Sequence, residues 1–223
     1  MIVAARVASS AALRHHAPAM RPLDLEADLR ALAGLDADVA AALERLGLPA
    51  SRRRPAGFEA LLRIIVGQQV STSAAASMWA RLDAGCGPIR AEKSAGLDLG
   101  TLQALGLSRQ KAGYALALAR DVAEARVDLV AVERLADEEA VTELVKAKGI
   151  GVWSAEIYLL FALGRGDVFP AGDLALQVGF QRLKRLRRRP EPERLRRLVA
   201  HWQPYRGAGA HFLWHLYAAP PLG

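Results

Sequence analysis

The chain has 223 residues, of which 52% are hydrophobic and 24% charged, and its net charge is +7. This composition is typical of an ordinary globular protein and excludes a disordered or fibrous one. The longest apolar runs, such as 157–163, are far shorter than the roughly 20 residues of a membrane-spanning helix, so we expect no membrane protein. The single cysteine, Cys86, excludes an internal disulfide and a four-cysteine iron–sulfur cluster. A reducing, cytoplasmic setting fits best.

The N-terminal segment differs in composition from the rest of the chain. Residues 1–22 contain arginine and histidine but no acid, since the first acidic residue is Asp24. We expect 1–22 to be a disordered or transit-like tail and 23–223 to fold as one helical domain. Alanine and leucine dominate that domain, and Gly, Pro, Asp or Ser interrupt its apolar periodicity, so the predicted class is all-α. Helices are predicted over 25–33, 36–46, 57–66, 72–82, 109–125, 131–136, 138–147, 152–163, 173–186, 191–202 and 207–217.

The stretch from 141 to 177 is the most informative. Two predicted helices meet at Gly149-Ile150-Gly151, a tight connection that predicts a helix-hairpin-helix. The N–H groups that begin the second helix are unpaired and the helix dipole favours an anion there, so the backbone can bind a phosphate. Ile150 is expected to be buried between the two helices. A tight turn without any ligand is the alternative interpretation of the glycines.

Asp173 begins the predicted helix 173–186, after Pro170 and Gly172. An aspartate in this place is an N-cap whose carboxylate accepts a backbone N–H. A capping carboxylate is also fixed in direction, as an electrostatic catalyst must be. Asp173 is therefore both a predicted cap and the candidate catalytic residue.

The positive charge is concentrated between residues 182 and 197, here called the basic tract. It holds nine basic residues and two acidic ones, while the rest of the chain is neutral. Lysines and arginines that neutralise phosphates release counterions, so the basic tract indicates a polyanionic partner. A solvated helix face is the alternative interpretation.

Five motifs, in order along the chain, resemble those of the helix-hairpin-helix DNA glycosylases, and within them the DNA-3-methyladenine glycosylase II branch. The resemblance covers about 58–216 and implies two helical subdomains flanking a DNA-binding cleft. One subdomain would span about 65–165 and the other about 23–64 together with 166–223. The motifs are IVGQQVS at 65–71, SRQKA at 108–112, GIGVWSA at 149–155, DVF at 167–169 leading to Asp173, and WQPYR at 202–206 with Trp214.

The resemblance assigns the catalytic role to Asp173 and places the loop of Gln68, Gln69 and Ser71 in the minor groove. Gln69 matches the residue that fills the gap left by an extruded base, and a glutamine there can also hydrogen-bond the orphaned partner. Lys148 replaces a proline common in the family and adds a cation beside the phosphate. The expected DNA-binding set is Gln68, Gln69, Ser71, Lys148, Gly149, Ile150 and Gly151.

Aromatic residues are expected to form the base pocket. Trp153 and Ile157 are four residues apart on one helical face and so can line one wall. The resemblance adds Trp214 opposite them, whereas Trp79 is expected in the core. Family members that also cut the backbone carry a lysine where this chain has Trp153, so water is the expected nucleophile.

These observations predict a monofunctional DNA glycosylase that hydrolyses the N-glycosidic bond of alkylated purines, of the 3-methyladenine and 7-methylguanine class, in base excision repair. The expected partner is double-stranded DNA with a damaged base. We expect a monomer that acts on the bacterial nucleoid, uses no metal for catalysis and has no cofactor beyond a monovalent cation at the hairpin. Two alternatives stay open: a glycosylase for uracil, hypoxanthine or an oxidised purine, and a non-catalytic DNA-binding module.

Overall fold

The computed structural model describes residues 21–220. This range contains thirteen α-helices and no strand beyond one isolated β-bridge between Pro22 and Arg165, so the predicted all-α class is confirmed. Among the described residues, no helix is long and apolar enough to cross a bilayer. Most of the predicted tail, residues 1–20, lies outside this range. Its last two residues are held in place, since Arg21 forms an ion pair with Asp28 and Pro22 makes the bridge.

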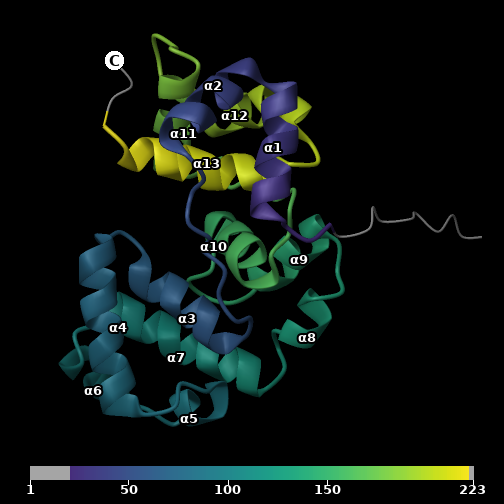
Figure 1. Ribbon diagram of the computed structural model, residues 1–223. Coiled ribbons are helices and arrows are strands. Elements are labelled where there is room, and N and C mark those ends of the chain that lie inside the picture. The colour runs from purple at the N-terminus through teal and green to yellow at the C-terminus, as the bar shows by residue number, and fades with distance from the viewer. Residues whose placement is uncertain (1–20, 221–223) are drawn as a thin grey trace, which may run out of the picture.

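The helices form two bodies joined through α10 (Figure 1). In the terminal body, both ends of the domain meet, because α11 packs against α13 and α1 packs against both α2 and α13. Its helices are α1 (Leu25–Leu35), α2 (Ala37–Leu46), α11 (Leu174–Leu183), α12 (Pro192–Leu198) and α13 (Arg206–Ala218), with a short 3-10 helix at Ala200–Trp202.

The central body is built around α7, which packs against α3, α5 and α6. Its helices are α3 (Phe58–Gly67), α4 (Thr72–Cys86), α5 (Ala91–Ala95), α6 (Leu99–Ala104), α7 (Arg109–Ala123), α8 (Leu129–Val132), α9 (Asp137–Leu144) and α10 (Val152–Tyr158), and a π-helical turn, Leu159–Leu163, continues α10.

Two features of the central body differ from the predictions. The predicted subdomain boundary between residues 64 and 65 divides α3, which the structure keeps whole in contact with α4, α7 and α10. Helices α5 and α6 were not predicted, because elements of five and six residues are too short to show a helical period.

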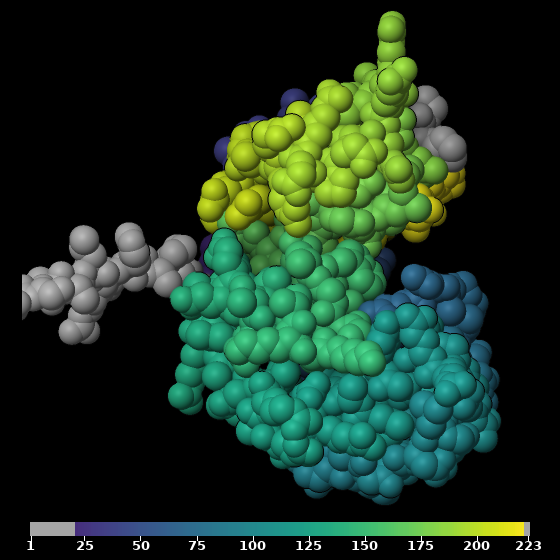
Figure 2. All heavy atoms as spheres, turned by 180° about the vertical axis from the view of Figure 1, so that it is seen from behind, coloured from purple at the N-terminus to yellow at the C-terminus, as the bar shows by residue number. Residues whose placement is uncertain are grey.

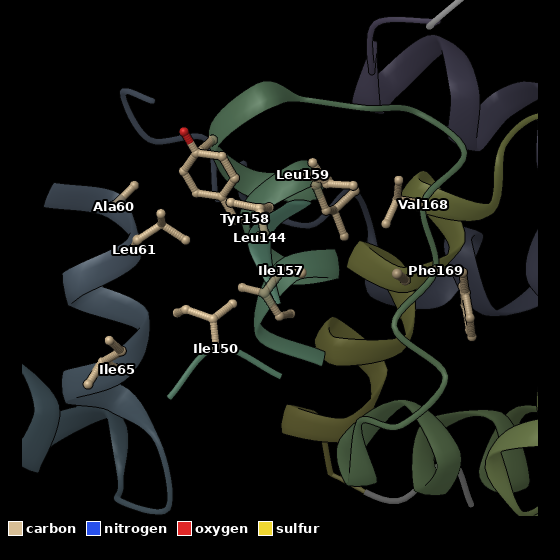
Figure 3. Close-up of a cluster of buried hydrophobic side chains, with 14 of the residues drawn as sticks. Ala60, Leu61, Ile65, Leu144, Ile150, Ile157, Tyr158, Leu159, Val168 and Phe169 are labelled. Atoms are coloured by element: carbon tan, nitrogen blue, oxygen red, sulfur yellow. The ribbon is translucent and has the colours of Figure 1, made fainter. Parts of the chain in front are cut away.

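Helix α10 forms the core of the junction between the bodies. Leu61 and Ile65 of α3 lie on one side of it, and Val168 and Phe169 of the following loop lie on the other (Figure 3). Tyr158 is fully buried there, and its hydroxyl accepts the backbone N–H of Gly57 at 3.0 Å. The space-filling view shows the teal and green part of the chain between the yellow-green terminal body and the blue part of the central body (Figure 2). Burial on both faces fixes α10 relative to each body.

A buried carboxylate organises the terminal body. Asp36 caps α2, and it accepts hydrogen bonds from the Trp202 indole at 2.8 Å and from Lys184 Nζ at 2.6 Å. Burial alone would raise the pKa of Asp36, but the hydrogen bonds from Lys184 and Trp202 outweigh it, and the pKa is lowered. One cation of the basic tract is therefore used to stabilise the fold.

Candidate active site and DNA-facing loops

A pocket of about 370 Å³ lies where the two bodies meet. Its volume falls in the range of small-molecule sites. The walls come from α3, α4, α10 and α13 and from the loop of residues 47–57 that joins α2 to α3, here called the arginine loop. Asp173, at the start of α11, borders the same space. The pocket therefore combines an apolar wall with one carboxylate.

Three N–H groups fix the carboxylate of Asp173. Its Oδ1 accepts the backbone N–H of Leu176 at 3.1 Å, which confirms the predicted N-cap of α11. The indole Nε1 of Trp153 donates to Oδ2 at 2.9 Å, and that of Trp214 donates to Oδ1 at 3.2 Å. Both oxygens are thus held at the positive end of a helix dipole, in a single orientation.

All three residues expected to line the base pocket border this cavity. Ile157 and Trp214 are buried and Trp153 is half-buried. Trp79 is buried as expected, yet it also forms part of the wall, with the Arg63 guanidinium 3.7 Å from its ring centre. The rings of all three tryptophans therefore line the pocket, and the indole N–H groups of Trp153 and Trp214 also hold Asp173.

The arginine loop supplies pocket residues that were not predicted. Arg52 and Arg54 both line the cavity, and the guanidinium of Arg52 lies 5.2 Å from the ring centre of Trp214 and 6.0 Å from that of Phe161. The backbone N–H of Arg54 donates to the Phe161 carbonyl at 2.9 Å, which ties the loop to α10. The available signal was the run of three arginines at 52–54, but charge alone does not place it beside Asp173.

The loop between α3 and α4 divides its residues between two directions. Gln69 is exposed and has a left-handed backbone, with φ of 55°. Ser71 is also exposed and caps α4 by accepting the N–H of Ala74 at 3.2 Å. Gln68 turns inward, and its amide donates to the Gly149 carbonyl at 2.9 Å and to the Ser154 hydroxyl at 3.1 Å. The Gln68 N–H donors are thus used inside the protein, and its expected contact with DNA stays a prediction.

The hairpin turn joins α9 to α10, and its two glycines differ. Gly149 has φ of 92°, and a Cβ there would meet the Tyr114 ring at 2.4 Å, so only glycine fits. Gly151 has φ of −95° and a Cβ there would meet nothing within 4 Å. Ile150 is buried as expected, whereas Lys148 is exposed. The open surface at Gly151 leaves room for the close approach of a ligand.

Helix α7 contacts both the end of α3, next to the α3–α4 loop, and the hairpin turn. Lys111 Nζ donates to the Val66 carbonyl near the end of α3 at 2.7 Å, and burial lowers the pKa of Lys111. Tyr114 packs on Gly149 and accepts a hydrogen bond from Gln110 at 2.8 Å. Residues of the motif at 108–112 therefore hold the α3–α4 loop and the hairpin turn from inside the protein.

The basic tract is only partly engaged within the protein. Lys184 pairs with Asp36, and Arg196 pairs with Glu156 at 3.2 Å. Seven exposed arginines form no ion pair with any described residue: Arg182, Arg185, Arg187, Arg188, Arg189, Arg194 and Arg197. Their charge is free to act on a partner.

A helix-hairpin-helix beside a cleft that holds a helix-capping aspartate defines a class of base excision repair proteins. Residues 62–204 match the family described as HhH-GPD superfamily base excision DNA repair protein, and the chain belongs to this family.

Relatives and solved structures agree with this assignment. The chain is 31% identical over 166 residues to DNA-3-methyladenine glycosylase 1 of Schizosaccharomyces pombe, a match that covers 70% of this chain and 71% of that protein. It is 30% identical to the protein YfjP of Bacillus subtilis over 70% of this chain, and it spans 58% of that relative's length. The solved S. pombe 3-methyladenine DNA glycosylase Mag1, in complex with abasic DNA, has a TM-score of 0.77 at 27% identity, covering 84% of this chain and 95% of that one.

Proposed function

We propose that this protein is a monofunctional DNA glycosylase that hydrolyses the N-glycosidic bond of alkylated purines during base excision repair. The observation that carries the proposal is the arrangement of Asp173, whose carboxylate caps α11 and accepts the N–H groups of Trp153 and Trp214 in a pocket that fits one base. The S. pombe relative's name, DNA-3-methyladenine glycosylase 1, supports the substrate class.

The chemistry follows from the charge of Asp173. A base stacked in a duplex is out of reach, so the damaged nucleotide must flip into the pocket. When the C1′–N bond breaks, its electron pair leaves with the base and the sugar becomes positively charged. The fixed carboxylate stabilises that charge. A water oxygen then bonds to C1′ and loses a proton to Asp173 or to solvent, which leaves an abasic site.

Trp153 supports hydrolysis without backbone cleavage. A lyase step needs an amine that attacks C1′ and forms a covalent intermediate. The position that carries this lysine in the resembling bifunctional enzymes holds Trp153, whose indole N–H is bound to Asp173. No lysine is among the described residues that line the pocket.

The exposed loops supply the proposed DNA contacts. Gln69 and Ser71 lie on one loop and Lys148 and Gly151 on the other, and the Gln68–Gly149 hydrogen bond holds the two loops together. We propose that one protein molecule binds damaged duplex DNA in the bacterial cytoplasm, on the nucleoid. The monovalent cation at the hairpin also stays a proposal. The Gly149 carbonyl, which accepts one hydrogen bond from Gln68, retains a second lone pair for it.

The decisive experiment incubates the protein with duplexes that each hold one lesion, then cleaves abasic sites with alkali. We expect strand breaks at 3-methyladenine and 7-methylguanine, and faster single-turnover release of these bases than of hypoxanthine or uracil, because a cationic base is the better leaving group. Faster release of a neutral lesion would favour the alternative glycosylase. No strand break at any lesion would favour a DNA-binding module without chemistry.

A further inference from the structure

One wall of the pocket already carries a positive charge. The Arg52 guanidinium lies over the rings of Trp214 and Phe161, within the range of a cation–π contact. A base that flips into the pocket would lie beside the same aromatic rings. Arg63 is paired with Glu59, but no ion pair joins Arg52 to a carboxylate of residues 21–220. Its five donors are therefore available to a ligand in the pocket.

The arginine loop fixes where Arg52 can reach. The backbone of the next residue but one, Arg54, is bound to Phe161, and Gly57 is bound to Tyr158. Arg53 points elsewhere, since its guanidinium packs against Gly164 and it does not line the pocket. Arg52 is thus the member of the 52–54 run that lies over the aromatic wall, in the pocket that contains Asp173.

The chemistry of a guanidinium selects among purines. Its planar fork donates two parallel hydrogen bonds to O6 and N7 of a 6-oxopurine. Hypoxanthine offers both acceptors and is neutral. In 7-methylguanine the methyl group blocks N7, and the base carries a positive charge that Arg52 repels. Adenine derivatives present an amino group where a 6-oxopurine presents O6.

We propose that Arg52 is a specificity-determining residue that contacts the flipped base and favours neutral 6-oxopurines over cationic N7-alkylated purines. This inference rests on the proposed glycosylase function. Alkylated purines are still released faster, because a cationic base is the better leaving group. Arg52 reduces the difference between their release rate and that of neutral 6-oxopurines.

The test compares wild type with Arg52→Met and Arg52→Lys on hypoxanthine and on 7-methylguanine in one duplex sequence, in single-turnover reactions. Arg52→Met should slow hypoxanthine release about tenfold and leave 7-methylguanine release equal or faster. Arg52→Lys keeps the charge without the fork, so it should slow hypoxanthine release while the rate on 7-methylguanine stays near that of wild type. Arg53→Met is the matched control, because it removes the same charge from the same loop outside the pocket, and it should preserve the ratio of the two rates.

Binding to a duplex with an abasic site separates a base contact from a phosphate contact. That site lacks a base, so Arg52→Met should bind it within about twofold of wild type, whereas loss of a phosphate contact would weaken binding. An equal change in both excision rates, or weaker abasic-site binding, would overturn the inference. So would a wild type that releases 7-methylguanine but shows no Arg52-dependent release of hypoxanthine. A folded wild type that releases neither base would instead overturn the proposed function, and the inference with it.

Discussion

The pocket and the basic tract both carry charge, but they hold it in opposite ways. In the pocket, Asp173 receives three N–H groups from three helices. In the basic tract, seven exposed arginines have no ion-pair partner among the described residues. A fixed charge suits a reaction, because stabilisation of a transition state requires no reorganisation when the bond breaks. An unfixed charge suits attraction of a polyanion, where the effect depends on number more than on position.

The strongest test of this contrast removes the charge of Asp173. Asp173→Asn keeps a side-chain oxygen that can accept the N–H of Leu176, so α11 and DNA binding should be preserved while excision falls at least about 100-fold. Single-turnover excision and equilibrium binding on the same duplex measure the two effects. Excision near the wild-type rate would leave Asp173 with only its capping role.

The next effect comes from the indole groups. Trp153→Phe and Trp214→Phe each keep an aromatic ring but remove one donor to Asp173. A charge-assisted hydrogen bond is worth about 1.5 to 3 kcal/mol, so each change should lower the excision rate roughly tenfold or more. Thermal melting serves as the control for folding. If both variants react as fast as wild type, cap and dipole alone are enough to hold the carboxylate.

The hairpin glycines separate folding from binding. Gly149→Ala should lower the free energy of unfolding by about 2 kcal/mol, since the new Cβ meets the Tyr114 ring and the backbone is left-handed. Gly151→Ala should leave the melting temperature unchanged but weaken DNA binding, because its Cβ projects into open space. Chemical denaturation and DNA titration distinguish the two. Wild-type DNA affinity of Gly151→Ala would remove Gly151 from the interface.

The basic tract is expected to have the smallest effect on excision, because it acts on DNA binding alone. Replacing Arg185, Arg187, Arg188 and Arg189 with alanine should flatten the salt dependence of DNA binding. The slope of log K against log salt concentration should become less steep by up to about 0.9 for each lost phosphate contact. The chemical step at saturating protein should stay unchanged. The matched control replaces four exposed arginines elsewhere, namely Arg30, Arg45, Arg90 and Arg134. Equal slopes for wild type and the tract variant would make the tract a solvated surface.

Local sequence patterns were enough to predict several features of this protein. The capping role of Asp173 and the burial of Ile150 depend on residues within a few positions, so sequence reasoning reaches them. The tight turn also predicts glycine at Gly149, although the Tyr114 ring that excludes a Cβ there lies on α7. Helices α5 and α6 of the central body were not predicted, because elements of five and six residues are too short to show a repeating apolar pattern. The direction of Gln68 could not be predicted, because its partners are in the hairpin turn and on α10, more than eighty residues away in sequence.

The sequence by itself determined an all-α chain with a capped helix, a hairpin and a concentrated positive charge, since each is a matter of local spacing, composition or count. Only the tertiary structure decided that the indole N–H groups of Trp153 and Trp214 bind Asp173, and that Arg52 lies in the same pocket. The physical reason is that α10, α11, α13 and the arginine loop are brought together by burial of apolar faces on both sides of α10. Many sequences satisfy that burial, and it leaves no local pattern that specifies which polar groups will converge.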